Sequence, residues 1–591
     1  MGELPSYLID LSPNIYNSDN YIVLDVETTN LDYGDPNNVG NRLLYSSYSG
    51  RFGGRVFGSE YDQGDLASAA EEVDFIVAHN AKFELGWLKR CGVRADRLLV
   101  FDTMIAEYVL AGNRAVPLDL DSVCERRGLE GKKKYVSKLI KSGYPPEDIP
   151  QSWLAEYCDQ DVKITHDLFK QQLQELQELG LLPVFFTRCI FTPVLTAMES
   201  QGMQLDCGRV YAEYNKVLSE FLEVDRELND YTGGINPNSP KQVAEYLYDR
   251  LGFAELKDRR GNPIRSAAGG RKTDVATIAG LKASNKQQRR FIELYERRNS
   301  LDTSLSKYLS KFKECCDNDG GLLYANFNQC RTRTHRLSSS GKTYKMQFQN
   351  FDRDYKPLFK AREEGNYVGE GDGAQLEFRV AAFLGQDQRA IEDIRNRFDV
   401  HTFTANTLTD AGQPTDRQGA KAHTFKPLYG GSSGTEAEQR YYQAFKDKYP
   451  GVAGAQEEWK QTVLKTKQLR TVTGLIFYWP DTKMQASGYI TNSTAICNYP
   501  VQMFATADII PIAVTYLHHR MVAAKLKSFL TNTVHDSAIS EVYPDERDVM
   551  KELYQYTFTT DVYNFLIKVF GIEFNVPLEC DVKFTKNWGE K

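Results

Sequence analysis

The sequence predicts two unlike parts, an α/β domain at the N-terminus and a larger α+β part after it. Residues 21–29 alternate as a strand does and open the first part. Residues 532–542 alternate on both sides of His535 and Asp536, which is typical of a hairpin with these two residues at its tip. Between them, residues 416–430 place cationic and aromatic side chains at steps of four, as one face of a helix would. A chain of 591 residues, 41% hydrophobic and 26% charged, can hold several ordinary globular domains.

The N-terminal strand carries a pair of carboxylates. Asp25 and Glu27 lie two residues apart, so the period of a strand puts both on one face. Ile22, Val23 and Leu24 make this strand largely apolar, which favours a buried strand over an exposed edge strand. Because paired carboxylates on a buried strand need a counter-ion, the pattern indicates a cation site.

Further acids follow in the N-terminal third. Glu84 and Asp102 come first, and Tyr157 then stands one helical turn before Asp161. The set resembles the four-carboxylate 3′ to 5′ exonucleases of the tyrosine-bearing subtype, which have an α/β, RNase H-like fold. The resemblance implies that two metal ions are held by Asp25, Glu27, Glu84 and Asp161. It also implies that Tyr157 positions the attacking water, that the chemistry is proofreading, and that Asp102 is structural.

Glu84 departs from the exonuclease pattern, because the family usually has Asp at this position. Its side chain is one methylene longer. Either the site tolerates the extra reach, or the second metal is displaced and proofreading is weak. We expect an active site.

In the second part, one predicted helix carries Arg417, Lys421, Phe425 and Tyr429 as a slanted stripe. Arg and Lys suit phosphate oxygens, while aromatic rings offer faces for stacking. An ordinary amphipathic helix with basic residues on its polar face is the alternative. Pro427 removes an amide donor, so a kink is expected between Phe425 and Tyr429.

Two aspartates accompany this helix. Asp372 follows a strand-like run that ends at Val368, and it precedes an apolar helical stretch. Asp536 stands at the tip of the predicted hairpin. Two such aspartates can hold a pair of Mg²⁺ ions about 3.5 to 4 Å apart. Each aspartate alone would more often be a turn residue.

The order of these motifs resembles the catalytic core of the family A DNA polymerases, the group of bacterial DNA polymerase I and many phage replicases. The match extends to residues 334–339, 349–350, 399–401, 498–502 and 507–510. The resemblance implies a right-hand polymerase domain with an α+β palm and mostly helical fingers and thumb.

The resemblance also implies a role for each matching residue. The metal ligands would be Asp372, Asp536 and the main-chain carbonyl of Gly373, with Mg²⁺ as the cofactor, two ions per active site, and Mn²⁺ as a substitute. The nucleotide would contact Arg417, Lys421, Phe425, Tyr429, His401, Gln375 and Glu377. Lys421 would also protonate the departing pyrophosphate. The primer and template would contact Arg336, Asn498, Gln502 and His535. The alternative for Arg336, Asn498 and Gln502 is that they are ordinary polar residues of the structure.

Glu377 bears on the choice of substrate, because in the resembling family this glutamate occupies the place of a ribose 2′-hydroxyl. We therefore expect deoxynucleotides, and the position argues against the single-subunit RNA polymerases. Two more departures are visible: Ser537 replaces an acid that commonly follows Asp536, and Thr494 stands where an arginine is common. The first leaves catalysis intact in our interpretation, and the second removes one contact to nucleic acid.

The expected domains are an exonuclease domain at 1–182 and a polymerase domain at 183–591. Within the second, we expect the thumb at about 205–325, the palm at about 326–390 and 486–591, and the fingers at about 391–485. Residues 193–203 resemble the helix that joins the two domains. Asn238 or Ser239 is expected to cap the helix that starts the thumb.

The expected partners are primer–template DNA and dNTPs, with a replisome helicase or a single-strand binding protein as further candidates. The net charge of −7 does not oppose this, since binding depends on where cations gather. Basic runs lie at 132–134, 259–260, 286–290 and 331–336. The thumb span leaves little room for a thioredoxin-binding insertion. No membrane span, zinc site or disulfide framework is expected from the ten scattered cysteines and the hydropathy.

The sequence thus predicts a DNA-templated DNA polymerase with 3′ to 5′ proofreading, acting in viral replication in the cytoplasm of a host cell. One alternative is a nuclease or nucleic-acid-binding protein whose polymerase half is inactive. Another is a cellular repair polymerase. RNA-templated activity is not excluded by any residue.

Overall fold

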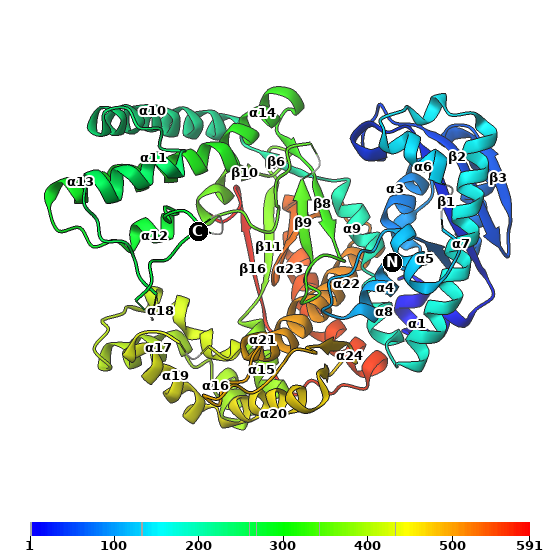
Figure 1. Ribbon diagram of the computed structural model, residues 1–591. Helices are drawn as coiled ribbons and strands as arrows, with labels where there is room; N and C mark the ends of the chain where they lie inside the picture. The colour runs from blue at the N-terminus through cyan, green and yellow to red at the C-terminus, as the bar shows by residue number, and fades with distance from the viewer. Residues whose placement is uncertain are drawn as a thin grey trace. The chain divides into compact units, whose positions relative to one another are not determined.

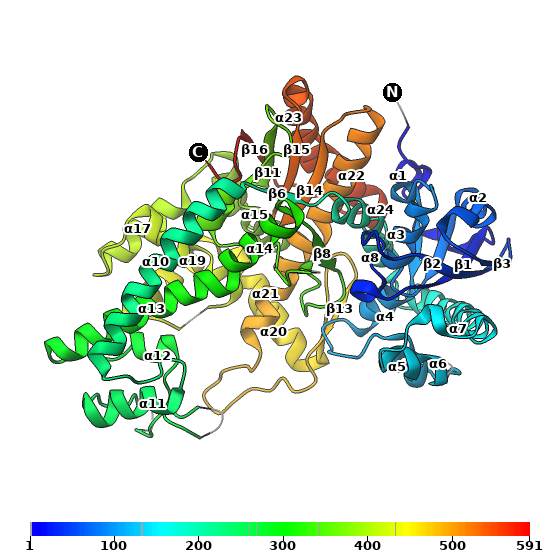
Figure 2. The same cartoon turned by 90° about the horizontal axis from the view of Figure 1, so that it is seen from above.

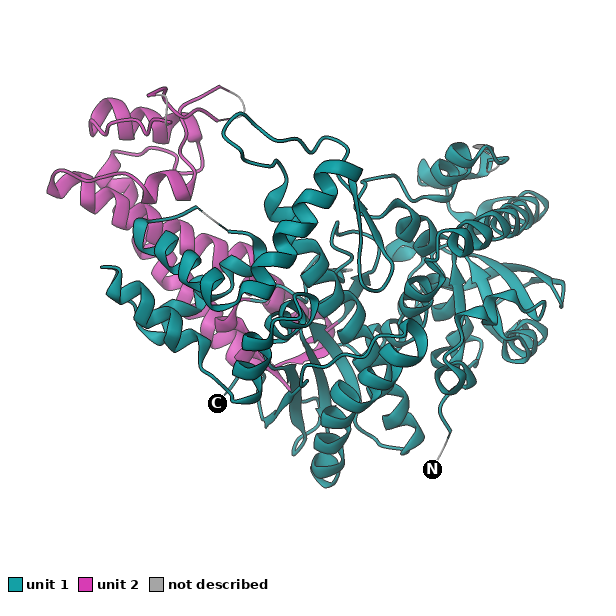
Figure 3. Cartoon of the chain, turned by 90° about the horizontal axis from the view of Figure 1, so that it is seen from below, with its two compact units in different colours: residues 1–202, 324–351, 361–591 teal, residues 203–323, 352–360 magenta. Residues whose placement is uncertain are grey.

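The computed structural model describes residues 3–131, 134–258, 261–266, 269–341, 343–431 and 433–590. Of the basic runs named above, Lys132, Lys133, Arg259 and Arg260 lie outside the described residues. The chain forms two compact units (Figure 3). Unit 1 comprises Met1–Gly202, Tyr324–Phe351 and Ala361–Lys591, and unit 2 comprises Met203–Leu323 and Asp352–Lys360.

The N-terminal domain of unit 1 is built on a five-stranded sheet with the order β3-β2-β1-β4-β5. Its strands are β1 (Tyr21–Thr28), β2 (Leu43–Gly50), β3 (Gly54–Phe57), β4 (Phe75–Ala78) and β5 (Val100–Asp102). Strand β1 lies in the middle, antiparallel to β2 and parallel to β4. The carboxylate pair of Asp25 and Glu27 therefore lies on an interior strand, as the apolar run before it predicted.

The long helix α7 (Gln151–Glu178) packs across β1, β2 and β4 (Figure 1). Shorter helices complete the domain: α1 (Ser6–Asp10), α2 (Gly64–Glu72), α3 (Lys82–Arg90), α4 (Thr103–Ala111), α5 (Leu120–Arg127) and α6 (Lys134–Lys141). Because α7 lies over β1, its inward face brings Tyr157 and Asp161 towards the strand that carries Asp25.

Helices α8 (Leu182–Cys189) and α9 (Thr192–Glu199) lead from this domain into the rest of unit 1. The guanidinium of Arg188 lies 2.6 Å from the carboxylate of Asp508, and both side chains are buried. Residues 182–199 and 493–523 are apolar enough to cross a membrane by length and composition, but 89% and 94% of the tested windows are buried in the protein. We therefore regard both as core helices.

The second sheet of unit 1 is antiparallel, with the order β14-β15-β11-β16 (Figure 2). It contains β11 (Tyr367–Gly373), β14 (Phe529–Val534), β15 (Ser537–Val542) and β16 (Cys580–Thr585). The predicted hairpin is confirmed, with His535 and Asp536 in the turn between β14 and β15.

The prediction that the preceding strand ends at Val368 was wrong, because β11 continues through Asp372 to Gly373. Glycines at alternate positions hid the strand, since glycine has little preference for strands. Gly371 has a packing reason: a Cβ atom there would overlap the ring of Tyr554.

The helices between the two halves of this sheet are α15 (Leu376–Leu384), α16 (Gln388–Arg395), α17 (Val400–Asp410), α18 (Arg417–Thr424), α19 (Glu436–Lys448), α20 (Pro450–Thr466), α21 (Ser493–Met503) and α22 (Ile510–Ala523). After them come α23 (Arg547–Tyr556) and α24 (Val562–Phe570). Two small hairpins pair β8 (Ala325–Asn328) with β9 (Ser338–Gly341), and β12 (Gln468–Arg470) with β13 (Ile476–Tyr478).

The predicted continuous helix from Arg417 to Tyr429 is wrong. Helix α18 ends at Thr424, and a separate 3₁₀ turn runs from Lys426 to Tyr429. Pro427 has no amide hydrogen to continue the helical ladder, so the break occurs where a kink was expected. The four side chains therefore do not form one stripe.

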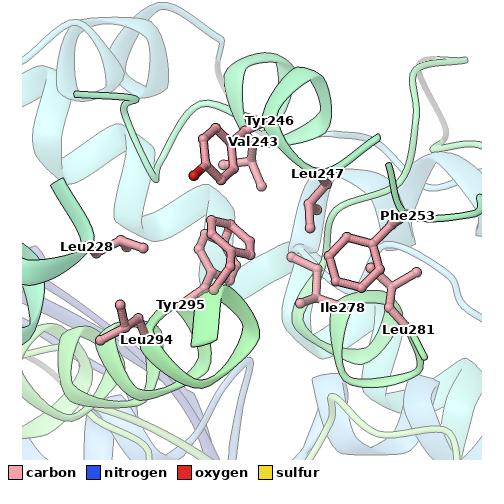
Figure 4. Packing of buried hydrophobic residues seen from close by; sticks show 10 residues of the cluster. Leu228, Val243, Tyr246, Leu247, Phe253, Ile278, Leu281, Leu294 and Tyr295 are labelled. Atoms are coloured by element: carbon pink, nitrogen blue, oxygen red, sulfur yellow. The ribbon is translucent and has the colours of Figure 1, made fainter. Parts of the chain in front are cut away.

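Unit 2 is mostly helical, with α10 (Cys207–Thr232), α11 (Pro240–Ala244), α12 (Val275–Ala279), α13 (Lys286–Ser304) and α14 (Ser310–Asp319) beside a small sheet of β6 (Met203–Leu205), β7 (Leu322–Leu323) and β10 (Phe359–Lys360). Its helices share a buried apolar cluster (Figure 4) that contains Leu228, Val243, Tyr246, Leu247, Phe253, Ile278, Leu281, Phe291, Leu294 and Tyr295. Ser239 caps α11 by accepting a hydrogen bond from the amide of Gln242.

The expectation that the cysteines form no disulfide framework needs a correction in unit 2. Cys207 and Cys316 form a disulfide between the start of α10 and α14, with their Cα atoms 5.6 Å apart. The two residues are 109 positions apart, so their spacing gave no signal. The other eight cysteines are free thiols.

Candidate active sites

The structure brings Asp372 and Asp536 together at one end of the second sheet. Asp372 pairs with Ser537 in the register of β11 and β15, and the amide of Gly373 donates a 2.8 Å hydrogen bond to the carbonyl of Asp536. His535 has a positive φ of 55°, which turns the chain sharply before Asp536. Gly373 thus lies directly between the two predicted metal-binding aspartates.

Burial, and then the neighbouring carboxylates Glu377 and Glu370, raise the pKa of Asp536 to about 6. The pKa of the Cys580 thiol on β16 is also raised, by burial first and then by the nearby Asp372. A cluster of acids that is costly to ionise is the environment that a divalent cation relieves. Carboxylate and carbonyl oxygens are also the ligands that Mg²⁺ prefers, so the residues present fit such an ion.

Arg336 and Glu377 meet beside these aspartates. The two side chains form an ion pair, and the Nε of Arg336 also donates to the hydroxyl of Thr506 at 2.9 Å. Burial raises the pKa of Glu377 despite the opposing effect of Arg336. Glu377 is the second residue of α15, whose N-cap Gln375 is exposed and has a left-handed backbone with φ of 50°.

The predicted DNA contacts converge on the same place. Asn498 and Gln502 lie one turn apart on α21, and the carbonyl of Gln502 accepts a 2.7 Å hydrogen bond from Thr506. Arg336 and His535 line one small cavity. Three separate segments supply this set, and through Arg336, Thr506 and His535 they meet at the acid cluster.

The predicted nucleotide-binding residues form a second group on α17 and α18. Arg417 lies 2.6 Å from the carboxylate of Asp399, which caps α17 and whose pKa this arginine holds well below its usual range. His401 shares a 3.0 Å hydrogen bond with the hydroxyl of Thr424. Burial, and then Arg417, lower the pKa of His401, which favours the neutral ring. Lys421 is exposed on α18, the helix that also carries Arg417.

Phe425 follows α18 and packs between the two groups. Its ring lies 5.5 Å from that of His401 and 6.2 Å from that of Phe378 on α15. Tyr429 is half-buried at the end of the 3₁₀ turn, which packs against α21. Gln456 of α20 holds this turn through the carbonyls of Pro427 and Leu428, each at 2.9 Å.

The predicted exonuclease acids gather around Cys158. Its thiol donates to the carbonyl of Asp25 at 3.3 Å, and its sulfur and carboxylate oxygens of Asp25 and Glu27 lie within 4.8 Å of one another. Burial raises the pKa of this thiol well above its usual value, and Asp25, Glu27 and Asp161 raise it further. Sequence reasoning missed Cys158, because a single thiol among acids carries no periodic signal.

The other members of this group are buried. Glu84 on α3, Asp161 and Tyr157 are each less than a tenth exposed. Three carboxylates from three elements and Glu27 beside Asp25 make a donor set that suits hard divalent cations. The structure accommodates the longer side chain of Glu84 without exposing it.

Asp102 has the structural role that the sequence suggested. Its carboxylate accepts hydrogen bonds from the amides of Asn80, Ala81 and Met104 at 2.8 to 3.0 Å. It thereby caps α4 and fixes the turn before α3. Burial raises its pKa to about 6 in spite of these bonds.

Ser537 and Thr494, the two departures noted above, make no described hydrogen bond to the acids, although Ser537 follows Asp536 and pairs with Asp372 in the ladder. Ser537 is buried and donates to the carbonyl of Val534 within the hairpin, at 3.0 Å. Thr494 is exposed on α21. Neither residue reaches the carboxylates of the site through a described hydrogen bond.

The fold is that of a right-hand polymerase with an attached nuclease domain. The polymerase part has the four-stranded antiparallel sheet with its acid pair and the helices that carry the cations. The nuclease part has the N-terminal sheet with its own acids. Residues 209–590 match the model of the family described as "DNA polymerase family A", and residues 8–177 match "3'-5' exonuclease". The chain belongs to DNA polymerase family A. The fold class predicted from the sequence is confirmed.

Curated relatives are described as DNA polymerase I. The protein of Synechocystis sp. is 26% identical over 87% of this chain and 53% of its own length, and that of Borreliella burgdorferi is 24% identical over 96% and 62%. The protein of Aquifex aeolicus is 25% identical over 87% of this chain and 88% of its own. The chain thus spans a little over half the length of the first two.

One solved structure has the same fold over the whole chain. It is described as "POL domain of Pol1 from M. smegmatis complex with DNA primer-template and dNTP". The TM-score is 0.77 with 20% sequence identity, and the match covers 100% of this chain and 99% of that chain. At this identity the likeness shows the fold.

Proposed function

We propose that this chain extends the 3′ end of a primer with dNTPs on a DNA template, and that a second site removes terminal nucleotides in the 3′ to 5′ direction. The observation that carries the proposal is the meeting of Asp372 and Asp536 at one end of the β11–β15 ladder, where Asp372 pairs with Ser537 and the Gly373 amide donates to the Asp536 carbonyl. Family membership and the relatives described as DNA polymerase I support it.

In the polymerase site, Asp372 and Asp536 would hold Mg²⁺, or Mn²⁺ in its place, with the carbonyl of Gly373. Bound divalent cations lower the pKa of an attacking hydroxyl and neutralise a leaving pyrophosphate. Arg417 and His401 would bind the triphosphate, with Arg417 exchanging the carboxylate of Asp399 for a phosphate. The Lys421 ammonium would give its proton to the pyrophosphate oxygen as it leaves.

Phe425 would pack against the incoming sugar and base, and Glu377 would exclude a 2′-hydroxyl. Gln375 would also contact the nucleotide, and Tyr429 would stand at the templating base. Arg336, Asn498, Gln502 and His535 would contact the primer and template. Their convergence around the acid cluster supports these roles, because the chemistry needs the primer end beside the metal-binding carboxylates.

In the exonuclease site, Asp25, Glu27, Glu84 and Asp161 would hold two divalent ions and Tyr157 would orient the attacking water. Two observations support the assignment: Glu84 and Asp161 are buried, and Asp25, Glu27 and Asp161 act on the buried Cys158 thiol. A buried carboxylate without a cation is costly. Proofreading follows when both sites act on one primer end.

The proposal extends to the biological setting named above, a viral replicase acting in a host cytoplasm. The relatives described above are bacterial, and a cellular polymerase would use the same chemistry. A helicase or single-strand binding protein is the partner class that either role would supply.

The test is extension of a labelled primer on a DNA template with Mg²⁺ and four dNTPs, repeated without nucleotides and on an RNA template. The unmutated chain is compared with Asp536→Ala and Glu84→Ala. Matched controls are the exposed acids Asp545→Ala, near the hairpin, and Asp167→Ala, on α7.

We expect extension to be lost in Asp536→Ala alone and primer shortening to be lost in Glu84→Ala alone. Shortening without extension in the unmutated chain would favour the nuclease whose polymerase half only grips a duplex. Extension on RNA as efficient as on DNA would replace the DNA-templated assignment.

A further inference from the structure

Two large aromatic side chains lie exposed beside the candidate exonuclease site. Tyr135 of α6 is 40% exposed and Trp153, in the first turn of α7, is 45% exposed. A single exposed aromatic residue is ordinary, but these two rings contact each other edge to face, 5.2 Å apart at an interplanar angle of 81°. The hydroxyl of Tyr135 also donates to the carboxylate of Glu156 at 3.4 Å. The pair is therefore held in a fixed orientation on the surface.

Trp153 lies in line with the candidate catalytic residues. Trp153, Tyr157 and Asp161 follow at steps of four on α7, so they share one face of that helix. With a rise of 1.5 Å per residue, Trp153 lies about 6 Å along the helix axis from Tyr157. One or two nucleotide steps of a single strand cover such a distance, since stacked bases are about 3.4 Å apart.

The pair is also anchored to the core beneath Tyr157. Val136 and Leu154, the neighbours of Tyr135 and Trp153 in the chain, pack in one buried cluster with Tyr157. Lys138 lies one turn after Tyr135 on α6 and is exposed. An aromatic face with a cation beside it is the arrangement that binds a base and its phosphate in single-stranded nucleic acid.

We propose that Tyr135 and Trp153 form a stacking platform for the second or third base from the 3′ end of a single strand that enters the exonuclease site. The inference rests on the exonuclease activity proposed above. Because the second and third bases of an intact duplex end are stacked on both faces, the platform accepts frayed or mismatched ends and not intact duplex ends. It therefore gives the nuclease a preference for the ends that need correction.

The first test compares 3′ nucleotide removal from single-stranded oligonucleotides by the full chain, Trp153→Ala, Tyr135→Ala and the conservative Trp153→Phe. Tyr61→Ala is the matched control, because Tyr61 is 89% exposed elsewhere in the same domain. For Trp153→Ala we expect KM to rise about tenfold with kcat unchanged, as loss of one stacked base would produce. Trp153→Phe recovers most of the affinity, and Tyr61→Ala and primer extension stay unchanged.

The second test locates the base. An oligonucleotide that lacks the base at the second or third position from the 3′ end should raise KM for the unmutated chain by the same factor. It should have no further effect on Trp153→Ala, since the contact is already lost. An equal loss in Trp153→Ala and the unmutated chain would overturn the proposal.

The activity and the platform fail in different ways. If the unmutated chain removes no nucleotide, the proposed exonuclease function fails, and fluorescence anisotropy with a labelled oligothymidine then tests the platform alone. Weaker binding by Trp153→Ala than by Tyr61→Ala, with equal melting temperatures, supports the platform. An active unmutated chain whose KM is the same as that of Trp153→Ala rejects it.

Discussion

Arg336 and Glu377 form an ion pair beside Asp536, one of the two aspartates proposed to bind metal. The two residues were assigned separate tasks, one at the primer and one at the sugar of the incoming nucleotide. Because Thr506 also holds the Arg336 guanidinium, the pair is fixed to η10 (Phe504–Ile509), which follows α21. The surface that would select the sugar and the surface that would hold the primer end are thus one structural unit.

We expect Glu377→Ala to incorporate ribonucleotides more readily, because it removes the side chain that would fill the space of a 2′-hydroxyl. Loss of discrimination by about tenfold or more is the scale for a single group in a binding pocket. The measurement is the ratio of kcat/KM for dCTP and CTP. Arg336→Met is the control, since it breaks the same ion pair and should weaken primer binding while leaving this ratio unchanged. Equal ratios in Glu377→Ala and the unmutated chain would contradict the assignment.

The raised pKa of Asp536, about 6, predicts that the metal-free protein loses stability as the pH rises. Below the ordinary carboxyl pKa the group is protonated in both states. Its contribution disappears as the pH rises through about 6, because the folded protein must then hold a buried charge. The loss is at most about 3 kcal/mol, from a shift of roughly two pH units at 1.36 kcal/mol each.

Chemical unfolding at pH 5 and pH 7.5 without metal measures this effect. Asp536→Asn should reduce the difference between the two conditions, and the exposed Asp545→Asn should not. Added Mg²⁺ should stabilise the unmutated chain more at pH 7.5 than at pH 5, since protons compete with the cation for the carboxylate. A pH dependence unaltered by Asp536→Asn would refute the prediction.

Arg417 and Lys421 should fail differently when replaced. Arg417→Ala removes binding that is the same before and during the reaction, so KM for dNTP should rise about tenfold with kcat nearly unchanged. Lys421→Ala removes the proposed proton donor and should lower kcat by about 100-fold or more. Steady-state kinetics on a fixed primer distinguish the two, with the exposed Gln418→Ala of the same helix as the control. A pure KM effect in Lys421→Ala would exclude it as the acid.

The buried ion pair of Arg188 and Asp508 should matter for stability. Asp508 is 0% exposed and also accepts a 2.9 Å hydrogen bond from Thr473. Arg188→Met would leave the Asp508 carboxylate buried without the guanidinium, at a cost of about 3 to 5 kcal/mol in the free energy of unfolding. Urea unfolding measures the change. Arg440→Met, which breaks the exposed pair with Glu436, is the matched control and should cost less than about 1 kcal/mol.

A double variant, Arg188→Met with Asp508→Leu, should be less destabilised than the sum of the two single variants, because no charge then remains buried. Additive losses would mean that the two side chains act independently.

The site residues that could best be predicted from the sequence are those for which more than one sequence pattern indicates the same role. Asp372 and Asp536 were found from separate motifs, and the strand ladder brought them together. Asp25 and Glu27 were predicted on an interior strand because the apolar run before them has no use at an edge. In each case the residue type and the local period carried the same information.

The failures have local causes. The glycines of β11 concealed a strand, because its stability comes from ladders on both sides and not from its own residues. The stripe from Arg417 to Tyr429 extended past Pro427, although that residue was a visible warning. Cys158 was overlooked because a thiol among acids carries no periodic signal, and the Cys207–Cys316 bond joins residues 109 positions apart.

The break after Thr424 divides residues 417–429, the segment proposed to bind the nucleotide, into two parts that can move separately. Helix α18 bears the phosphate-directed cations, whereas the 3₁₀ turn with Tyr429 is clamped by Gln456 and rests on α21. The backbone at Phe425 can change conformation when α18 rotates, so Tyr429 can keep its position. Under the proposed roles, capture of the triphosphate and inspection of the templating base would then be successive events, each with its own rate.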